Sequence, residues 1–288
     1  MKKLLSLFLS LGLCLNGLSG AEIPESAKVG AFYAGCQAYS FRMFSVMEAI
    51  EKTAQAGGKT IEFYPGQKLS VEQADVVFKH GVPEEVIAAV KAKLAKEGVT
   101  AVAYGVVRLG KDDVENRKVF AFAKTMGIGI LTTEPDVAAM DQIEALVKEF
   151  DIKIAIHNHP RKPLDRSYLF WDPNYVLGLV KDRDARMGAC ADTGHWVRSG
   201  LDPVECVRIL KGRIFDSHLK DLNEKGNPKA HDVPYGTGVS DVTAILNAFV
   251  EGGFYGPVHT EYEYNWENSV GDITKCLEFV KAFVPAGK

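Results

Sequence analysis

Eight stretches rich in β-forming residues alternate along the chain with amphipathic stretches of helical periodicity, at intervals of roughly 30 residues. Chains that repeat a strand and a helix in this way are α/β proteins with a parallel sheet. Eight such units predict a single (β/α)8 barrel. A doubly wound open sheet is the alternative, but it places its ligand at one switch point of the sheet. The expected strands span residues 32–41, 60–63, 100–106, 129–132, 153–156, 187–191, 214–217 and 257–260.

The first 21 residues have the pattern of an export signal. Lys2 and Lys3 precede an apolar run over 4–15, and Ser-Gly-Ala at 19–21 is typical of a cleavage site. The apolar run is too short for a good membrane-spanning helix, so we expect no membrane span. We therefore expect an exported protein, periplasmic or secreted, with a signal peptide over 1–21, a polar linker over 22–30 and one barrel domain over 31–288.

The composition is that of an ordinary globular domain, with 47% hydrophobic and 25% charged residues. The formal net charge is −3 and the chain has no long basic run, so we expect no nucleic-acid partner, because phosphate binding needs a basic surface. The cysteines after the expected signal match neither a zinc knuckle nor a disulfide framework, and buried free thiols are the favoured interpretation. They are Cys36, Cys190, Cys206 and Cys276.

Four polar clusters follow expected strands in the second half of the chain: 157–159 (His-Asn-His), 192–195 (Asp-Thr-Gly-His), His218 and Glu261. Because the carboxyl ends of barrel strands meet at one rim, these side chains are expected to converge there. Taken singly, each has a more ordinary interpretation as a hydrogen-bonded scaffold residue or a helix cap. Together, their mixture of imidazoles and carboxylates predicts a site for Mn²⁺, Zn²⁺, Co²⁺ or Fe²⁺ rather than Ca²⁺.

The alternation of side chains along a strand groups further polar residues with these clusters. Residues 216, 218 and 220 share one face of the seventh expected strand, and residues 259, 261 and 263 share one face of the eighth. Polar side chains crowded inside a barrel are costly unless their lone pairs find partners. A bound metal ion would supply such a partner.

Five phrases resemble motifs of the xylose-isomerase-like sugar isomerase/epimerase superfamily, whose members are TIM barrels. They are Ile-His-Asn-His-Pro (156–160), Asp-Thr-Gly-His (192–195), His-Leu-Lys-Asp (218–221), Pro-Tyr-Gly-Thr-Gly (234–238) and Thr-Glu-Tyr-Glu (260–263). They occur in the family's order, and the resemblance covers essentially the whole chain after the expected signal. Relatives include sugar epimerases, inosose dehydratases, 3-dehydroshikimate dehydratases and enzymes that act on 3-keto-glycosides.

The resemblance implies that Asp192, His218 and Glu261 are metal ligands and that His195 contacts substrate or transfers a proton. Many members carry a glutamate after the fifth strand, where this chain has histidines. We interpret His157 as the replacement ligand, with His159 as the competing choice. Epimerases of this type use that glutamate as one of two carboxylates flanking the substrate, so its absence makes a two-glutamate epimerisation less expected here.

Other residues are candidates for the remaining roles. Glu134 after the fourth strand is the best candidate for a substitute base, Lys220 could donate a proton to a carbonyl, and Glu261 is also a candidate for proton transfer. Each has a plain alternative, such as an exposed loop acid or a salt bridge. The candidate substrate-binding residues are Glu62, His159, His195, Trp196 and His231, with Trp171 and Tyr64 as further stacking faces.

A metal ion beside a carbonyl promotes proton transfer at the neighbouring carbon, which supports isomerisation, epimerisation or loss of a β-oxygen. Our first hypothesis is a metal-dependent isomerase or epimerase acting on a carbohydrate. The second is a lyase or hydratase acting on a keto-sugar or 3-keto-glycoside, and the third is a non-catalytic sugar-binding barrel. We leave open a homo-oligomer. Two long connections, 64–82 and 222–240, are expected to overhang the site.

Overall fold

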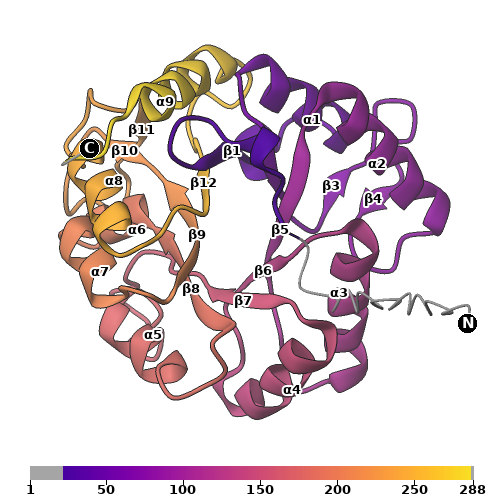
Figure 1. Cartoon of the computed structure of the whole chain (residues 1–288), viewed down its shortest axis with the longest axis horizontal. Coiled ribbons are helices and arrows are strands. Elements are labelled where there is room, and N and C mark those ends of the chain that lie inside the picture. Colours follow the sequence, from indigo (N-terminus) through magenta and orange to yellow (C-terminus); the bar gives the residue numbers. More distant parts are fainter. Residues whose placement is uncertain (1–21, 287–288) are drawn as a thin grey trace, which may run out of the picture.

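The computed structural model describes residues 22–286 and confirms the predicted barrel. Eight parallel strands close in the order β1-β12-β9-β8-β7-β6-β5-β2, and helices surround them (Figure 1). The strands are β1 Tyr33–Gln37, β2 Thr60–Phe63, β5 Thr100–Val107, β6 Ile130–Thr133, β7 Lys153–Ile156, β8 Met187–Asp192, β9 Ile214–Leu219 and β12 Pro257–Thr260.

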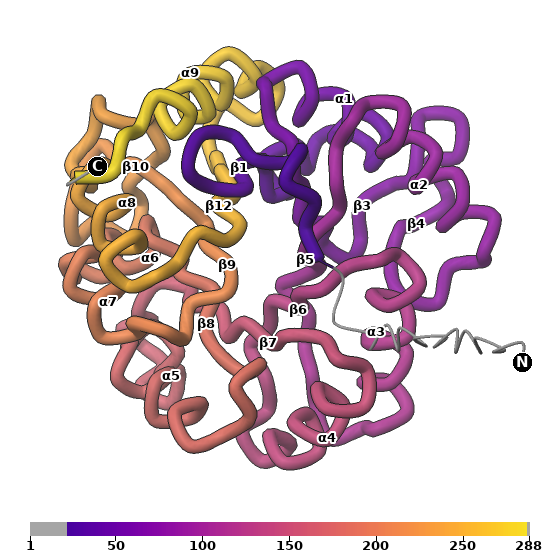
Figure 2. The backbone as a smooth tube through the Cα atoms, viewed as in Figure 1, coloured from indigo at the N-terminus to yellow at the C-terminus, as the bar shows by residue number. Residues whose placement is uncertain are grey.

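The chain runs once around the barrel, and its first and last strands pair to close it. Figure 2 shows β1 in indigo beside β12 in yellow, and their register pairs Tyr33 with Pro257 and Cys36 with Thr260. Each connection between parallel neighbours passes through at least one helix, as a crossover requires. The helices are α1 Val46–Gln55, α2 Glu84–Glu97, α3 Asp113–Met126, α4 Met140–Phe150, α5 Pro173–Val180, α6 Thr193–Arg198, α7 Pro203–Ile209, α8 Val242–Glu251 and α9 Val270–Ala282.

Local sequence signals account for the helix ends. Ser45 and Glu48 form a capping box at the start of α1, and Asp112 accepts backbone N–H groups at the start of α3. Gly98 and Gly127 end α2 and α3 in the left-handed region, with φ of 64° and 78°, where other residues would be strained. These signals account for the residues at which α1 and α3 begin and at which α2 and α3 end.

The first expected strand, 32–41, is too long. The structure ends β1 at Gln37 and continues with the 3-10 helix η2, Ala38–Phe41. The Gln37 side chain accepts a hydrogen bond from the backbone N–H of Tyr39, at 2.6 Å, and so caps the turn. The turn contains the β-forming residues Tyr39 and Phe41, and Phe41 is buried, which is why the pattern resembles a longer strand.

The expected polar linker over 22–30 is packed against the barrel. It contains the 3-10 helix η1, Glu25–Ala27, and Val29 pairs with Phe32 in an isolated bridge. Ala27 and Val29 are buried, and Ile23 packs against a small cluster inside the barrel around Val102 and Ile130. The segment therefore covers part of the barrel rather than hanging free of it. The expected signal peptide, 1–21, lies outside the described residues, and export stays a prediction.

The long connections carry small antiparallel ribbons. Residues 64–82 contain β3 Gln67–Lys68 and β4 Val77–Phe78, and residues 222–240 contain most of the ribbon of β10 Asp221–Leu222 and β11 Asp232–Val233. A third long connection, 157–172 between β7 and α5, carries no strand or helix. All three leave the carboxyl ends of barrel strands, so they surround the mouth of the barrel.

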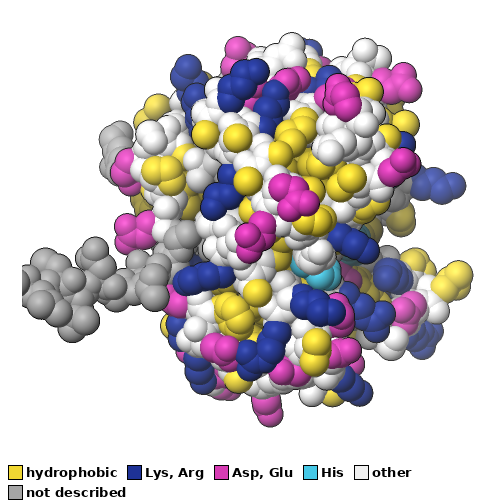
Figure 3. Space-filling model, turned by 90° about the vertical axis from the view of Figure 1, so that its right-hand side faces the viewer, with side chains coloured by type: hydrophobic (Ala, Val, Ile, Leu, Met, Phe, Trp, Pro, Cys, Tyr) yellow, Lys and Arg dark blue, Asp and Glu magenta, His cyan; other side chains and the backbone are white. Residues whose placement is uncertain are grey.

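Most of the hydrophobic core lies between the strands and the surrounding helices. The four cysteines that the structure describes are buried and free, as predicted. No helix within 22–286 is long and apolar enough to cross a membrane. On the face drawn in Figure 3, Lys and Arg side chains are interspersed with Asp and Glu.

Candidate metal centre

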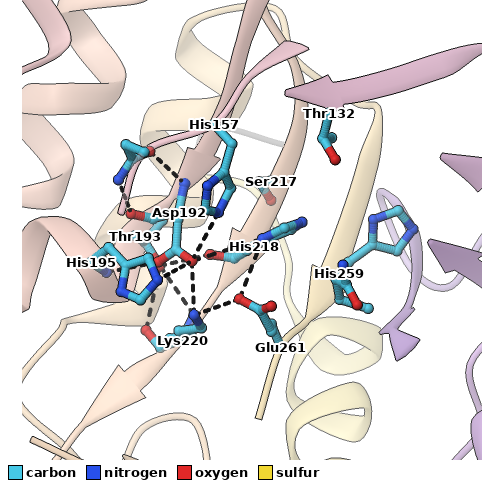
Figure 4. A network of polar contacts seen from close by, with 12 residues as sticks. Thr132, His157, Asp192, Thr193, His195, Ser217, His218, Lys220, His259 and Glu261 are labelled. Carbon is cyan, nitrogen blue, oxygen red and sulfur yellow. Dashed lines mark hydrogen bonds and ion pairs between the residues drawn. The ribbon is translucent and has the colours of Figure 1, made fainter. Parts of the chain in front are cut away.

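Four side chains from the ends of four strands converge inside the mouth of the barrel (Figure 4). Asp192 ends β8, His218 lies in β9, and His157 and Glu261 directly follow β7 and β12. Each offers one ligand atom, and these four atoms all lie within 4.8 Å of one another. All four residues are buried. The structure thus places His157, and not His159, with the other three.

The separations within this four-ligand set match the space around one ion. Nε2 of His157 lies 3.5 Å from Oδ2 of Asp192, and Nδ1 of His218 lies 3.4 Å from Oε2 of Glu261 and 3.8 Å from Oδ2 of Asp192. Tetrahedral ligands at the usual 2.0–2.1 Å from zinc are about 3.3 Å apart. Both nitrogens of His157 and Nδ1 of His218 are buried without a hydrogen-bond partner. Nε2 of His157 and Nδ1 of His218 face the other ligands, so a divalent metal fits there and would satisfy these two atoms.

A carboxylate lies behind each imidazole of the set. Nε2 of His218 lies 2.6 Å from Oε2 of Glu62, and Nδ1 of His157 lies 3.7 Å from Oε1 of Glu134. Metal-ligating histidines commonly direct their second nitrogen to a carboxylate, which fixes the ring and its tautomer. Burial favours the neutral acid of Glu62, but the His218 imidazole outweighs it and holds the pKa of Glu62 at about 2.

Glu62 does not have the position expected of a substrate-binding residue. Its side chain is fully buried at the second strand, and its other oxygen accepts a hydrogen bond from Thr132. His259 and Asp216 complete this polar layer beneath the four-ligand set, with Nδ1 of His259 2.9 Å from Oδ1 of Asp216. Because the strands close into a barrel, inward residues of β2 and β9 meet inside it.

The Asp-Thr-Gly-His segment builds the site through its backbone as well as its side chains. Oδ1 of Asp192 accepts the backbone N–H of His195 at 2.7 Å and caps α6, which leaves Oδ2 to face the ligand set. Asn158 donates to the carbonyl of Asp192 and accepts from its N–H, at 2.9 and 3.0 Å, so the end of β8 is tied to the segment after β7. Asp192 thereby caps α6 with one carboxylate oxygen and presents the other to the four-ligand set.

Lys220 is the buried cation of the site, 1% exposed. Its Nζ lies 2.8 Å from Asp192 Oδ2, 2.6 Å from Glu261 Oε2 and 3.0 Å from Glu263 Oε2. Burial opposes its charge, but these three carboxylates outweigh that effect and raise the pKa of Lys220 well above its ordinary value. The stem of Lys220 lies on Gly194, where a Cβ would be 2.6 Å from the Cβ of the lysine. The glycine of this segment is therefore needed to make room for Lys220.

Asp221, next in the chain, anchors the Pro-Tyr-Gly-Thr-Gly loop. Its carboxylate accepts the backbone N–H groups of Gly236, Gly238 and Ser240 at 2.9, 2.9 and 3.0 Å. A Cβ on Gly238 would lie 2.3 Å from Oδ1 of Asp221. The Asp221 of His-Leu-Lys-Asp and the glycines of Pro-Tyr-Gly-Thr-Gly are thus two halves of one structural contact.

Glu134 contacts the imidazole of His159 at the mouth of the barrel. Its Oε1 lies 2.5 Å from Nδ1 of His159 and accepts a hydrogen bond from the hydroxyl of Tyr168 at 2.6 Å. The His159 side chain is 45% exposed, whereas His157 is buried. In the neutral ring of His159, the carboxylate therefore holds Nδ1 as a donor and leaves Nε2 as an acceptor. Glu134 itself, the expected base, is engaged by these partners.

His195 lies next to His159, with the two rings stacked at a centroid distance of 5.2 Å. Its Nδ1 lies 3.1 Å from Nη1 of Arg198, a donor-only group, so the proton of a neutral ring must be on Nε2. Burial holds the pKa of His195 well below its ordinary value and keeps the ring neutral. Arg198 also reaches Glu263 at 2.5 Å and Asp232 at 3.1 Å, so it connects α6 to the segments after β12 and β10.

One of the expected substrate contacts is not at the mouth. Trp196 is 1% exposed and belongs to the hydrophobic core, because α6 turns its indole away from the site toward the helices. His231 lies in the connection 222–240 and stacks on Tyr264 at a centroid distance of 4.3 Å, and its contact with substrate stays a prediction. Trp171 lies under the guanidinium of Arg161, and Tyr64 packs edge-to-face on Tyr39 at 5.2 Å.

Several residues of the site have no clear signal in the sequence. Tyr168 comes from the long connection 157–172, and Asp232 from the β10–β11 ribbon, far from any expected strand end. Arg198 follows His195 by three residues, so helical spacing places both on one face of α6, but this short helix is not evident from sequence. Glu263, a further supporting residue, does have a sequence signal, because it shares one face of the eighth expected strand with Glu261.

The fold and the site define a class: a closed (β/α)8 barrel with a buried histidine–carboxylate centre at the carboxyl ends of its strands. The family model described as "Xylose isomerase-like TIM barrel" matches residues 50–282. The chain belongs to this family.

Solved structures share the fold. A crystal structure of a protein from Parabacteroides distasonis is 32% identical and has a TM-score of 0.70, with 87% of this chain and 98% of that chain covered. The D-allulose 3-epimerase of a Methylomonas species, in complex with D-allulose, is 18% identical with a TM-score of 0.64, over 86% and 96% of the two chains. A xylose isomerase-like barrel from Mycobacterium smegmatis, in complex with magnesium, is 14% identical with a TM-score of 0.64, over 88% and 97%.

One curated relative has a more local similarity. The inosose dehydratase of Clostridium tetani is 31% identical over 91 residues, which is 30% of this chain and 27% of that protein. The match therefore spans about a quarter of the dehydratase.

Proposed function

We propose that this protein is a metal-dependent lyase or hydratase that acts next to the carbonyl of a keto-sugar or keto-glycoside. The observation that carries the proposal is the stacked pair of imidazoles, His159 and His195, beside the four-ligand set. The similarity to a protein named as a dehydratase agrees with this reaction class. The fold shared with sugar epimerases agrees with a carbohydrate substrate.

The two imidazoles have complementary states. Glu134 makes Nε2 of His159 an acceptor, and Arg198 makes Nε2 of His195 a donor. An elimination needs a base that takes the proton next to the carbonyl and an acid that protonates the departing β-oxygen. His159 fills both roles in this scheme, and the N–H of His195 donates a hydrogen bond to the leaving oxygen. The C–H proton passes to Nε2 of His159, the C–O bond breaks, and the imidazolium of His159 returns the proton to the leaving oxygen, so that both rings end neutral. Hydration is the same sequence in reverse.

His157, Asp192, His218 and Glu261 would hold the metal. When bound, a divalent ion polarises the substrate carbonyl and so acidifies the neighbouring C–H bond. Glu62 and Glu134 orient the two ligand imidazoles, and Lys220 and Arg198 offset the negative charge of the surrounding carboxylates. The polar layer inside the barrel keeps these groups in place without substrate contact.

Epimerisation, one part of the first hypothesis from the sequence, is less well supported by this arrangement. A two-base epimerisation requires acceptors on both faces of the carbon. The position that supplies the second carboxylate in many relatives is His157, and its two nitrogens face Asp192 and Glu134. The remaining acceptor and donor, His159 and His195, lie together on one side of the set.

The test is incubation of the metal-loaded protein with free ketoses and 3-keto-glycosides in D₂O, followed by NMR. Loss of water or of the aglycone, with appearance of an unsaturated ketone, supports the proposal. Deuterium gained at the carbon next to the carbonyl without loss of either group would instead identify an isomerase or epimerase. Binding without exchange would identify a sugar-binding barrel.

A further inference from the structure

Lys220 and the four-ligand set share two oxygen atoms. Nζ of Lys220 lies 2.8 Å from Oδ2 of Asp192 and 2.6 Å from Oε2 of Glu261. The same two oxygens face the ligand imidazoles, with His157 Nε2 3.5 Å from Asp192 and His218 Nδ1 3.4 Å from Glu261. A buried ammonium therefore contacts the oxygens that a divalent ion would use (Figure 4).

The charges of Lys220, Asp192 and Glu261 determine how their contact affects metal binding. Asp192 and Glu261 bring two negative charges into a buried space, where like charges repel and are costly without a counter-charge. The ammonium of Lys220 supplies one positive charge, so the pair is partly neutralised before any metal binds. A divalent ion would neutralise the pair by itself, and with Lys220 still in place the group would carry a net positive charge.

A second acceptor for the ammonium lies beside the site. Oε2 of Glu263 is 3.0 Å from Nζ of Lys220, and Glu263 is outside the four-ligand set. The stem of the lysine is held against Gly194, so only its end is free to shift. Arg198 holds Glu263 from the other side, at 2.5 Å, and keeps that carboxylate in reach.

We propose that Lys220 is an internal counter-cation: it keeps Asp192 and Glu261 in place before a metal binds, and it lowers the affinity of the site for that metal, with Glu263 receiving the ammonium in the metal-bound protein. This inference rests on the metal site of the proposed function but on neither the substrate nor the reaction. It makes Lys220 a residue that sets how tightly the metal is held and how readily the metal exchanges.

The test is the dissociation constant of Zn²⁺ and Mn²⁺, measured by competition with a chromogenic chelator on the purified full chain. Lys220→Met is expected to bind each ion at least tenfold more tightly than the wild type, because the competing charge is gone. In EDTA its thermal midpoint is expected to fall below that of the wild type, and added metal is expected to restore it. Lys275→Met is the matched control, since Lys275 is an exposed lysine of α9 paired with Asp272.

A second variant tests the other half of the inference. Glu263→Gln removes the alternative acceptor, so it is expected to weaken metal binding severalfold. Its midpoint in EDTA is also expected to fall, because Arg198 and Lys220 lose a charged partner, so the dissociation constant is the readout for this variant. It also carries the test if Lys220→Met does not fold, because an unchanged dissociation constant in Glu263→Gln overturns the proposal. Metal binding by Lys220→Met that is equal to or weaker than that of the wild type would show that Lys220 only positions the ligands. A wild type that binds neither ion would overturn the metal site, and the proposed function with it.

Discussion

Nε2 of His218 lies 2.6 Å from Oε2 of Glu62, a residue 156 positions earlier in the chain, and both side chains are fully buried. The contact turns Nδ1 of His218 toward Asp192 and Glu261. A carboxylate behind a ligand histidine fixes the ring and makes it a better donor to a metal. Glu62 therefore supports the candidate metal centre from across the barrel.

Replacing this carboxylate is expected to weaken metal binding without removing a ligand. Glu62→Gln keeps the shape of the side chain but loses its charge, and losses of this kind cost roughly 10- to 100-fold in metal affinity. The measurement is a Zn²⁺ competition titration, with Glu251→Gln, an exposed glutamate at the end of α8, as control. An affinity equal to that of the control would contradict the supporting role.

The two histidines after β7 are expected to separate into different roles. His157→Ala should lose bound metal, because Nε2 of His157 faces Asp192 inside the four-ligand set. His159→Ala should keep the metal and lose turnover by roughly 10²- to 10⁴-fold, the usual contribution of a general base. Metal content by elemental analysis and turnover of an identified substrate check the two effects. Retention of metal by His157→Ala would return the ligand role to His159.

Gly194→Ala is expected to destabilise the protein by about 1–3 kcal/mol, because the added methyl group would overlap the stem of Lys220. Gly178→Ala is the matched control. Gly178 lies inside α5, and a methyl group added there would have nothing within 4 Å, so alanine should stabilise by roughly 0.5–1 kcal/mol. Urea unfolding monitored by circular dichroism gives both values. Equal effects of the two substitutions would argue against close packing of Lys220 on Gly194.

Asp221→Ala is expected to release the Pro-Tyr-Gly-Thr-Gly loop. Three backbone N–H groups, those of Gly236, Gly238 and Ser240, would lose their common acceptor, at a cost of about 1–3 kcal/mol for each group left buried and unsatisfied. Hydrogen exchange of residues 234–240 should rise, while exchange in the β7 and β8 strands should not. Protection of the loop equal to the wild type would show that other contacts hold it.

The fold could be predicted from the sequence because its signals are local. Hydrophobic periodicity, helix caps such as Ser45 and end glycines such as Gly98 act within one or two turns of chain. The end of the first strand could not be predicted, because a single hydrogen bond from Tyr39 to the Gln37 side chain turns a buried β-like segment into a 3-10 helix. The packing of residues 22–30 against the barrel could not be predicted either, because it depends on distant contacts.

The convergence of the metal-centre candidates could be predicted from the sequence, but the exact position of each candidate side chain could not. Strand ends in a parallel barrel meet at one rim, so Asp192, His218 and Glu261 are expected to converge wherever the loops lead. The expectation for Trp196 is wrong because a short helix, α6, rotates its indole into the core. Glu62 lies deeper than expected, behind His218, because the depth of a residue inside a barrel depends on strand register, which no local pattern reveals.

The sequence by itself determined the barrel, the rim at which its polar residues gather, and their types, since these depend on short-range periodicity and on the parallel order of strands. Only the tertiary structure decided which histidine joins the ligand set, which carboxylate stands behind each ring, and that Lys220 contacts the oxygens of Asp192 and Glu261. The physical reason is that these roles depend on distances between atoms far apart in the chain, and such distances arise only when the barrel closes.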